Sequence, residues 1–585
     1  MSKKDFIPAV YTIGDETTAD SVVMALVGSG GDGVVLLGNL VMELAARQGL
    51  FGIMVQSYGP QIRGGESAAI IRLACHEMNY EGDTTDLLLC FRVSDLKRFD
   101  AQVRLHPGSR VILEQHDDSE IPAWLGPARD NAYRFPFARR EGDLEVEAEP
   151  KNMLGLGLVC RAMGWPLELA RELLLERFGD RPEWLEKNMG GLERGYAAPD
   201  APKLLPLRGE PSRKKLRIES GNEAVARGAM AAGVRFFAGY PITPSSEIME
   251  TLIDELPGVG GRVVQAEDEI ASLGMVVGAS FGGVPAMTAT SGPGLSLMTE
   301  MLGLAGISDL PVVVVDCQRA GPATGMPSRT EQADLNHAVF GGHGDFPRVV
   351  LGVFDTVHAR DVMFRAVHLS ENYQIPVLVL SDAYIAQRRS IHEEWTAPAA
   401  PVLRRVWHEG DGPARFSLDG DGFVTPFRVP GTPGGEYLAA GLEHTASGAP
   451  SADTMVHQQM SARRFRKVDA IAVETRDWFR TVGRDDAPRG IIAWGSQYGM
   501  LRKLVRVHPE YRAFLPEILY PFPLEAFEEW RKGLEWSGVV ELSYTSQFFH
   551  YLGGLTSMTG VHRVARAGGI PMSLIEFDQL VSEAK

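Results

Sequence analysis

Cysteine is scarce in this chain, and its placement excludes several kinds of site. The 585 residues include 4 cysteines, at positions 75, 90, 160 and 317. Structural zinc sites and iron–sulfur clusters usually take closely spaced thiolates, and no Cys-x-x-Cys pair occurs here. We therefore expect neither a metal nor a cluster on this chain, and we interpret all four cysteines as buried and inert.

Long apolar runs and basic blocks are missing as well. Runs such as Val312–Val315 are far shorter than the ~20 residues of a membrane helix, and the N-terminus (MSKKDFIPAV) does not resemble a secretory signal. The net charge of 58 − 75 = −17 leaves no footprint for nucleic acid. Two short cationic clusters, Arg213–Lys215 and Arg463–Lys467, are interpreted as solvated faces. We expect a cytoplasmic protein that binds neither membranes nor nucleic acid.

The order of apolar strands and helical patterns is typical of an α/β protein with several parallel-sheet domains. At roughly 150 residues per domain, the length suggests three or four of them. We divide the chain into an α/β domain (1–197), a proline-bearing linker (198–215), a second α/β domain (216–389), an irregular segment rich in Pro and Gly (390–486) and a third α/β domain (487–585).

Strands are predicted in all three α/β domains, and a helix is predicted over residues 34–49. In the first domain, a strand, a glycine turn, a helix and a second strand follow one another, which is the pattern of a parallel sheet. The predicted strands are Ser21–Val27, Phe51–Gln56, Arg235–Ala238, Val312–Asp316, Pro376–Ser381, the IIAW string after Gly490, and Gly538–Leu542.

The first glycine turn, GSGGDG, matches Gly-x-Gly-x-x-Gly between a strand and a helix. Its backbone N–H groups, at Gly28, Ser29 and Gly30, are candidates for a contact with coenzyme A or another anion. A dinucleotide site would need an acid about 20 residues further on, whereas the second strand ends Val55-Gln56-Ser57-Tyr58. Dinucleotide binding is therefore disfavoured, and a phosphate contact and a simple packing turn remain open.

A second glycine-rich string, SYGPQIRGG (57–65), combines an aromatic residue, a proline and an arginine. Arg63 is a candidate anion contact, because its planar guanidinium can bind an anion bidentately. The alternative is a rigid turn with an exposed arginine.

The string GYPITPSSE (239–247) follows a predicted strand and precedes a helical pattern. Two prolines brace the loop, which presents the hydroxyl of Thr243 at the carboxyl end of a strand, where ligands of parallel sheets usually lie. A purely structural alternative is that Ser245 and Ser246 cap the following helix.

Two further strand ends carry polar groups. Glu267, Asp268 and Glu269 enter a helix, as acids at a helix N-terminus often do, and an SGPG turn (291–294) opens the next helix. The loop 317–335, CQRAGPATGMPSRTEQADL, places Arg319 and Arg329 together. Two cations on one strand-end loop favour an anionic substrate.

Together these strings resemble the 2-oxoacid:ferredoxin oxidoreductases, which are thiamine diphosphate enzymes. The resemblance lies in GYPITPSSE, AEDEIASLGMVVGAS, TSGPG and GPATGMPSRTEQADL, with VPGTPGG and AGLEHTASG in the irregular segment. GSGGDG and SYGPQIRGG resemble the family's gamma subunit, fused ahead of the alpha subunit, and IIAWGSQYGM and ILYPFPLEAF resemble its transketolase-C-like domain. The sequence departs from the family at ELSYTSQFF, which starts at Glu541. Family members tend to have an Asn and a Gly-Gln after the strand that ends in Glu, and only Gln547 of these is present here.

The resemblance implies roles for particular residues. Residues 216–389 are expected to be the domain that binds the pyrimidine ring of thiamine diphosphate. In such enzymes the glutamate that bonds the ring nitrogen lies nine residues before a helix glycine, and counting back from Gly278 selects Glu269. Thr243 is expected to bond the substrate, and Arg319 and Arg329 to pair with its charge. Further cofactor contacts are expected from Tyr240, Pro241, Ile242, Ser291 and Gly292.

The resemblance also implies that the enzyme is incomplete on this chain. The family places the diphosphate and Mg²⁺ site and a [4Fe–4S] cluster on a separate beta subunit, in an assembly of two alpha and two beta chains. The 2-oxoacid is decarboxylated on the cofactor, electrons pass through the cluster to ferredoxin, and coenzyme A takes the acyl group.

We expect 2-oxoglutarate to be the preferred substrate, with succinyl-coenzyme A as the product. In the reverse direction, succinyl-coenzyme A would be carboxylated reductively. Its second carboxylate needs a cation when it is buried, and Arg329 supplies one beyond Arg319. The alternatives are pyruvate or broad 2-oxoacid specificity, a thiamine enzyme without electron transfer, and a non-catalytic scaffold that binds a partner.

Overall fold

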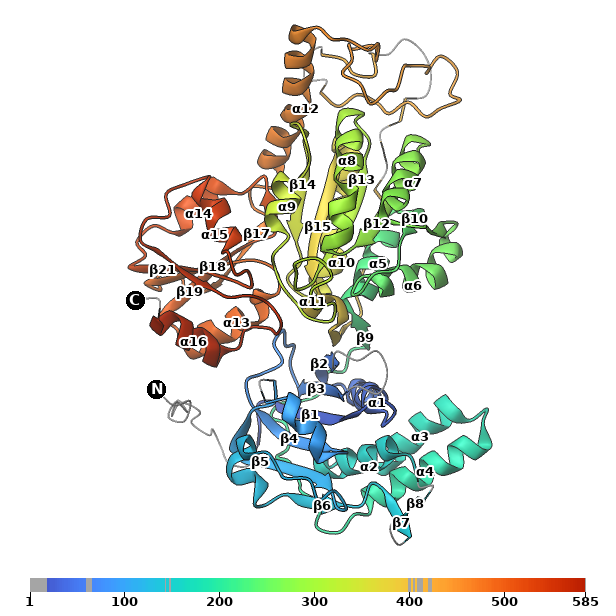
Figure 1. Ribbon diagram of the computed structural model, residues 1–585, viewed down its shortest axis with the longest axis vertical. Coiled ribbons are helices and arrows are strands. Elements are labelled where there is room, and N and C mark those ends of the chain that lie inside the picture. Colours follow the sequence, from blue (N-terminus) through green and yellow to red (C-terminus); the bar gives the residue numbers. More distant parts are fainter. Residues whose placement is uncertain are drawn as a thin grey trace. The chain divides into compact units, whose positions relative to one another are not determined.

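The chain divides into two compact units (Figure 1). Unit 1 contains Met1–Ile218 and Arg389–Glu394, and unit 2 contains Glu219–Arg388 and Trp395–Lys585. None of the described helices combines the length and apolar character that a bilayer crossing requires. The computed structural model describes residues 18–58, 66–100, 102–141, 144–146, 149–397, 401–402, 404, 406–407, 414–418 and 423–583.

Unit 1 is built on a mixed sheet flanked by helices. The helices are α1 (Val34–Arg47), α2 (Lys151–Met163), α3 (Leu167–Phe178) and α4 (Pro182–Tyr196), with short 3₁₀ turns at Val93–Arg98 and Ala123–Arg129 and a small ribbon of β7 (Arg139–Glu141) and β8 (Leu144–Val146). The strands, in sheet order, are β6 (Tyr133–Phe135), β5 (Leu105–Glu114), β4 (Thr85–Cys90), β1 (Val22–Ser29), β3 (Glu66–Ala74), β2 (Phe51–Tyr58), β16 (Arg389–Glu393) and β9 (Leu216–Ser220).

The first two predicted strands are confirmed, but they do not lie side by side as a parallel pair. β3 lies between β1 and β2 and is antiparallel to both. The sheet is also extended by β9 and β16, so strands from both ends of the segment 216–389 belong to this sheet. The sequence pattern missed this arrangement because a strand that is buried on both faces reads the same in either direction.

Unit 2 contains two sheets with helices around them. The central sheet has the order β11 (Arg262–Gln265), β10 (Phe236–Gly239), β12 (Ala286–Thr290), β13 (Val312–Gln318), β15 (Pro376–Asp382), β14 (Val349–Gly352) and β20 (Ile518–Tyr520). Within the described residues, β20 is antiparallel to β14 and the other neighbouring strands are parallel. Its helices are α5 (Gly221–Ala232), α6 (Ser246–Glu255), α7 (Glu269–Phe281), α8 (Gly292–Ile307), α9 (Leu335–Phe340), α10 (Thr356–Tyr373) and α11 (Ala383–Gln387), with a 3₁₀ turn at Leu256–Val259.

The C-terminal sheet of unit 2 shares its core with the central sheet. Trp494, Phe514 and Phe548 pack in one buried cluster with Val312 and Val350. The strands are β17 (Phe479–Gly483), β19 (Tyr511–Pro516), β18 (Arg489–Ala493), β21 (Trp536–Glu541) and β22 (Val561–Ala565), and the helices are α13 (Gln497–Val507), α14 (Leu524–Trp530), α15 (Gln547–Gly553) and α16 (Leu574–Glu583). This sheet therefore begins with β17, before the boundary at residue 487 that we drew from the sequence. β20 follows β19 in the chain but belongs to the central sheet.

The prediction of irregular structure over 390–486 is wrong for its last part, where α12 spans Thr454–Glu474. Asp453 caps this helix, accepting hydrogen bonds from the backbone N–H groups of Met455 and Val456. Its buried face includes Arg463 and Lys467, which hides the apolar periodicity that normally reveals a helix.

The same residues correct the prediction that Arg463–Lys467 is a solvated face. Lys467 Nζ lies 2.5 Å from Asp309 Oδ1 and Arg463 Nη1 lies 2.6 Å from Asp309 Oδ2, and all three side chains are buried. Burial lowers the pKa of Lys467 to about 7, against the attraction of Asp309. The cluster fastens α12 to the turn before β13, and removing Asp309 would leave buried charges uncompensated.

Candidate active site

The loop Gly239–Ser245 between β10 and α6 is held from two sides by hydrogen bonds to its backbone. Asn222 Nδ2 donates to the carbonyl of Pro244 at 2.7 Å, and Arg319 Nη1 donates to the carbonyl of Thr243 at 2.8 Å. Thr243 itself is exposed. The loop is therefore braced through its carbonyl groups, while the Thr243 side chain remains accessible.

The alternative role for the two serines of this loop is not supported. Ser245 is the N-cap residue of α6, yet its side chain makes no capping bond, and its hydroxyl donates to the Ile242 carbonyl at 3.0 Å instead. The serine therefore stabilises the turn of the loop rather than the helix. Of the predicted cofactor contacts, Tyr240 and Pro241 are exposed and Ile242 is half-buried.

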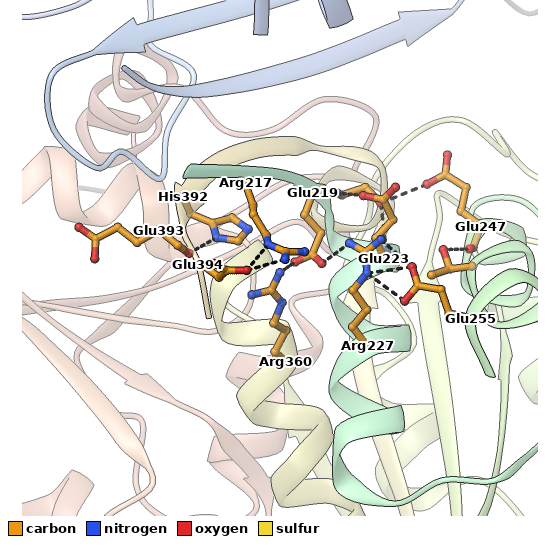
Figure 2. A network of polar contacts seen from close by, with 12 residues as sticks. Arg217, Glu219, Glu223, Arg227, Glu247, Glu255, Arg360, His392, Glu393 and Glu394 are labelled. Carbon is orange, nitrogen blue, oxygen red and sulfur yellow. Dashed lines mark hydrogen bonds and ion pairs between the residues drawn. The ribbon is translucent and has the colours of Figure 1, made fainter. Parts of the chain in front are cut away.

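A polar network around the start of α5 explains why Asn222 is held so firmly (Figure 2). The fully buried Glu219 forms ion pairs with Arg227 and with the buried Arg360, and Arg227 also pairs with Glu255 of α6 at 2.7 Å. Ser220 and Glu223 form a reciprocal capping box at the N-terminus of α5. These contacts fix the first turn of α5 and with it the Asn222 side chain.

Glu269 is the buried acid of the three that enter α7. Asp268 is the N-cap, accepting from the backbone N–H of Ala271 at 2.7 Å, whereas Glu267 is exposed. Glu269 is 6% exposed. A Cβ atom added at Gly294 would lie 2.7 Å from Glu269 Oε1 and 2.0 Å from Thr290 Oγ1, so the glycine leaves the space that the carboxyl occupies.

The carboxyl group of Glu269 also lacks a hydrogen-bond donor within the described part of the chain. No hydrogen bond to its oxygens is found among the described residues, although Arg319 attracts it electrostatically. A buried acceptor usually has a partner. The arrangement therefore fits a ligand that donates a hydrogen bond to Glu269, as the ring nitrogen of an aminopyrimidine would once protonated.

The predicted residues Ser291 and Gly292 lie at the start of α8. Ser291 is the buried N-cap residue, and its hydroxyl has no hydrogen-bond partner among the described residues. A Cβ atom added at Gly292 would lie 2.7 Å from Asp334 Oδ2. The two glycines of the SGPG turn thus allow carboxyl groups of Glu269 and Asp334 to approach the same helix end.

The loop 317–335 contains both predicted cations. Arg319 is 9% exposed, and burial lowers the pKa of its guanidinium against the attraction of Asp334 and Glu269. Burial also lowers the pKa of the half-buried Arg329. Arg319 thus has a structural duty at Thr243 in addition to its charge.

The segment Thr330–Gln332 connects this loop to the C-terminal sheet. The Glu331 carboxylate accepts from the backbone N–H groups of Gly321 and Gly568, both at 2.9 Å. Gln332 Nε2 donates to the Trp494 carbonyl at 3.0 Å, and Gln547 Nε2 donates to the Ala333 carbonyl at 2.5 Å. Gln547 is the one residue kept from the family motif near the C-terminus, and its side chain makes this contact inside unit 2.

Two acids that sequence reasoning missed lie beneath the helix end. Asp316 of β13 is fully buried, and its carboxyl faces that of Asp334. Burial raises the pKa of Asp334 to about 6, with repulsion from Glu331 adding to it, and burial together with Asp334 raises the pKa of Asp316 well above its usual range. An aspartate inside the apolar string VVVVDCQ was the available signal. Asn222 gave no comparable signal.

In the glycine turn of unit 1, both donors of Ser29 bond carboxylates of the protein. The Ser29 backbone N–H donates to Asp32 Oδ2 at 2.9 Å, and the Ser29 hydroxyl donates to Asp95 Oδ2 at 2.7 Å. Arg92 and Lys151 flank Asp32, each at 3.5 Å. Ser29 therefore has no donor left for an anion in this arrangement. A Cβ atom at Gly28 would meet Phe91 at 2.9 Å, as in a packing turn. Arg63 lies outside the described residues.

Two family matches cover most of the chain. Residues 227–463 match the family "Pyruvate flavodoxin/ferredoxin oxidoreductase, thiamine diP-bdg", and residues 23–198 match "Pyruvate ferredoxin/flavodoxin oxidoreductase". The fold and the site therefore define an oxidoreductase subunit with a thiamine diphosphate-type binding domain.

Curated relatives and a solved structure make the assignment more specific. The chain is 30% identical over 539 residues to the 2-oxoglutarate oxidoreductase subunit KorA of Mycobacterium tuberculosis, covering 85% of this chain and 81% of the relative. It is 37% identical over 371 residues to the 2-oxoglutarate synthase subunit KorA of Methanothermobacter marburgensis, and this match covers 60% of the present chain and 94% of the relative. The chain also matches a solved structure of 2-oxoglutarate:ferredoxin oxidoreductase from Magnetococcus marinus with 2-oxoglutarate, coenzyme A and succinyl-CoA bound. The TM-score is 0.87 and the identity 30%, and the match covers 97% of this chain and 100% of the solved one.

The chain belongs to the 2-oxoacid:ferredoxin oxidoreductase family, with the gamma-type and alpha-type parts fused in one polypeptide. It is an enzyme subunit, and the resemblance read from the sequence is confirmed. The α/β fold class with several sheets that contain parallel strands is confirmed as well.

Proposed function

We propose that this chain is the fused gamma–alpha subunit of a 2-oxoglutarate:ferredoxin oxidoreductase. The reaction converts 2-oxoglutarate and coenzyme A into succinyl-coenzyme A and carbon dioxide, with electrons passing to ferredoxin, or runs in reverse. The observation that carries the proposal is the buried Glu269 carboxyl group, which has no donor among the residues that the structure describes, beside the Arg319 side chain that holds the Thr243 loop. The bound ligands of the similar Magnetococcus structure support the choice of substrate.

Glu269 is proposed to hold the pyrimidine end of thiamine diphosphate. The cofactor supplies a nucleophilic carbon and accepts the electrons released when the 2-oxoacid loses carbon dioxide. The Glu269 carboxyl, at the N-terminus of α7, exchanges a hydrogen bond with the ring nitrogen and stabilises the tautomer that is ready to react. Gly294 provides the space for that carboxyl, and Ser291 and Gly292 form the adjoining wall.

Thr243, Arg319 and Arg329 are proposed to hold the substrate. The exposed Thr243 hydroxyl can bond the carboxylate or the 2-oxo group next to the reacting carbon. Arg319 positions the Thr243 loop and adds positive charge there. Arg329 pairs with the second carboxylate of 2-oxoglutarate, which pyruvate lacks.

The substrate assignment is tested with Arg329→Met and with Arg329→Lys as the matched variant that keeps the charge. Arg329→Met is expected to raise KM for 2-oxoglutarate at least about 10-fold, the loss of roughly 1.4 kcal/mol of binding, with a much smaller change for pyruvate and 2-oxobutyrate. Arg329→Lys should lie between wild type and Arg329→Met, because it keeps the charge without the bidentate fork. Equal losses for all three acids, or a wild-type preference for pyruvate, would contradict the assignment.

A beta subunit is proposed to complete the site with the diphosphate, Mg²⁺ and a [4Fe–4S] cluster, in an assembly of two alpha and two beta chains. The exposed face of α7 and α8 supports a docking surface for it. Ile270, Met275 and Leu297 are 45%, 41% and 50% exposed there, and Cβ atoms added at Gly274 and Gly278 would meet nothing. A surface with apolar side chains and small residues allows another chain to approach closely.

Dependence on the partner is tested by viologen reduction with 2-oxoglutarate, coenzyme A and thiamine diphosphate. The purified chain alone is expected to be inactive, and the chain produced together with its beta subunit is expected to be active and brown. Robust activity of the single chain would overturn this part of the proposal. Coenzyme A is kept as co-substrate, but we do not assign it a contact at Ser29, whose donors both bond carboxylates.

A further inference from the structure

The loop that follows the last strand of the C-terminal sheet has a shape that its own arginine fixes. This C-terminal loop, residues 566–573, joins β22 to α16. Because a guanidinium offers five N–H donors in a rigid fork, one arginine can bond several carbonyls of a loop. Arg566 Nη1 donates to the carbonyl of Ala567 at 2.7 Å, and its Nη2 donates to that of Ile570 at 3.0 Å. The same guanidinium forms an ion pair with Glu576, which anchors the C-terminal loop to α16.

Two glycines of the C-terminal loop allow it to pack against the backbone of Thr330. The N–H of Gly569 donates to the Thr330 carbonyl at 2.7 Å, and the two residues form an isolated antiparallel bridge. Gly569 has φ +117°, a conformation that residues with a Cβ atom rarely adopt. A Cβ atom added at Gly568 would lie 2.2 Å from the Thr330 carbonyl oxygen and 2.6 Å from Glu331 Cβ. Glycine at both positions therefore permits the close contact.

The Glu331 carboxylate joins the C-terminal loop to the loop that carries Arg329. The side chain is buried, with 7% exposure. Its Oε1 accepts from the N–H of Gly568 and its Oε2 from the N–H of Gly321, both at 2.9 Å. Hydrogen bonds from backbone N–H groups to a carboxylate are charge-assisted and stronger than those between neutral groups. Each oxygen of Glu331 thus bonds a different loop.

The backbone of Arg329 is held from two directions along the chain. Within its own loop, its carbonyl accepts from the N–H of Ala320 at 2.9 Å, and its N–H donates to the Met326 carbonyl at 3.0 Å. The next two residues, Thr330 and Glu331, are the ones that contact the C-terminal loop. The place from which the half-buried Arg329 side chain extends is therefore set in part by a loop about 240 residues further along the chain.

We propose that Glu331 and Gly568 are positioning residues for substrate selectivity, because through them the C-terminal loop holds Arg329 where its guanidinium meets the second carboxylate of a dicarboxylic 2-oxoacid. The inference rests on the proposed function of Arg329. Bidentate binding by a planar guanidinium depends on the position of the fork, so a shift of the backbone that carries it weakens the pairing. The effect of both positioning residues is expected to pass through Arg329.

The contact between the two loops is tested by amide hydrogen exchange on the purified full chain. Gly568→Ala places a methyl group against the neighbouring backbone, and Glu331→Gln leaves one acceptor oxygen for two N–H donors. Both changes are expected to speed exchange in a peptide spanning residues 317–335 at least about 5-fold, because the segment opens more often. Gly553→Ala is the matched control, since a Cβ atom there would have its nearest neighbour at 3.9 Å. Unchanged exchange in both variants would overturn the inference, whatever the substrate of the protein.

The effect on selectivity is measured as KM in the assembled enzyme. Gly568→Ala and Glu331→Gln are each expected to raise KM for 2-oxoglutarate about 5-fold, with less than about 2-fold change for pyruvate and 2-oxobutyrate. The kcat should stay within about 2-fold of wild type, because the reacting atoms do not move. Combined with Arg329→Met, either change should raise KM no further, since its effect passes through a guanidinium that is then absent. Gly553→Ala should match wild type for all three acids.

The outcomes separate this inference from the substrate assignment. If Arg329→Met is selective for 2-oxoglutarate while Gly568→Ala and Glu331→Gln affect all three acids equally or not at all, the positioning role is overturned and the assignment stands. Additive effects in the double variants would also overturn the positioning role. If Arg329→Met shows no selectivity, the assignment and the selectivity role fall together, and faster exchange then supports only the contact between the loops. Should Gly568→Ala fail to fold, Glu331→Gln carries both measurements.

Discussion

Two loops of this chain look alike in sequence, since each follows an apolar strand, is rich in Gly or Pro and precedes a helix. The GSGGDG turn of unit 1 uses Asp32 and Asp95 to satisfy the donors of Ser29. The GYPITPSSE loop of unit 2 has its carbonyls held by Asn222 and Arg319, while Thr243 is exposed and Glu269 finds no hydrogen-bond donor in the described part of the chain. In the first loop the Ser29 donors already bond carboxylates of the protein, whereas the second loop is held through its carbonyls and leaves the Thr243 side chain accessible.

This contrast shows what a glycine-rich turn can and cannot indicate. Glycine permits close approach of the backbone, but the approaching group can be a neighbouring side chain as readily as a phosphate. The distinguishing feature is a buried polar group whose partner is missing from the protein. That feature is visible only in the folded structure.

The largest expected effect is at Glu269. Glu269→Gln in the assembled enzyme should lower turnover by ~10²-fold or more, the range for lost acid–base assistance. Glu267→Gln is the matched control, because Glu267 lies two residues earlier, before the helix begins, and is exposed. Steady-state oxidation of 2-oxoglutarate checks both. If the two variants exchange their effects, the pyrimidine carboxyl has been assigned to the wrong acid.

A moderate effect is expected at Asn222, which braces the second loop without touching a ligand. Asn222→Ala removes the bond to the Pro244 carbonyl and leaves a buried acceptor unsatisfied, at a cost of about 1–3 kcal/mol. We expect kcat/KM to fall about 5–10-fold with little change in the cofactor requirement. Asn222→Ser, which keeps a donor, should recover part of the loss. Unchanged kinetics in the alanine variant would show that the loop needs no brace.

The smallest effect on turnover is expected at Asp32 of the first loop. Asp32→Ala should lower the free energy of unfolding by about 1 kcal/mol, because the partly buried N–H of Ser29 loses its acceptor. Turnover and the KM for coenzyme A should stay within about 3-fold of wild type. A large change in that KM would break the comparison, since it would make the first loop a ligand site as well.

The sequence predicted the parts of the fold that repeat a simple pattern. β13 and β15 are buried along their whole length and read as apolar runs, and α1 has the expected helical period. By contrast, the helix α12 was missed because Arg463 and Lys467 occupy its buried face. The insertion of β3 between β1 and β2 depends on long-range pairing, which local periodicity does not encode.

The candidate site also contains residues that the sequence could reveal and contacts that it could not. The strings that carry Thr243, Glu269 and Arg329 could be recognised, because special residues gather there at strand ends. The supporting contacts could not, since Asn222 and Arg319 act on residues that lie 22 and 76 positions away in the sequence. Arg319 was expected, together with Arg329, to meet the substrate. The structure shows that Arg319 also holds the Thr243 loop through a hydrogen bond to its backbone.

The most direct test of the central claim follows the proton that Glu269 is proposed to help remove. The exchange of the thiazolium C2 proton of bound thiamine diphosphate for deuterium is measured by quenched-flow NMR in the assembled wild-type enzyme, in Glu269→Gln and in Glu267→Gln. We expect exchange at least ~10²-fold slower in Glu269→Gln and unchanged in Glu267→Gln. Equal exchange rates in wild type and Glu269→Gln, with the cofactor bound in both, would contradict the assignment of this chain as the half that activates the cofactor.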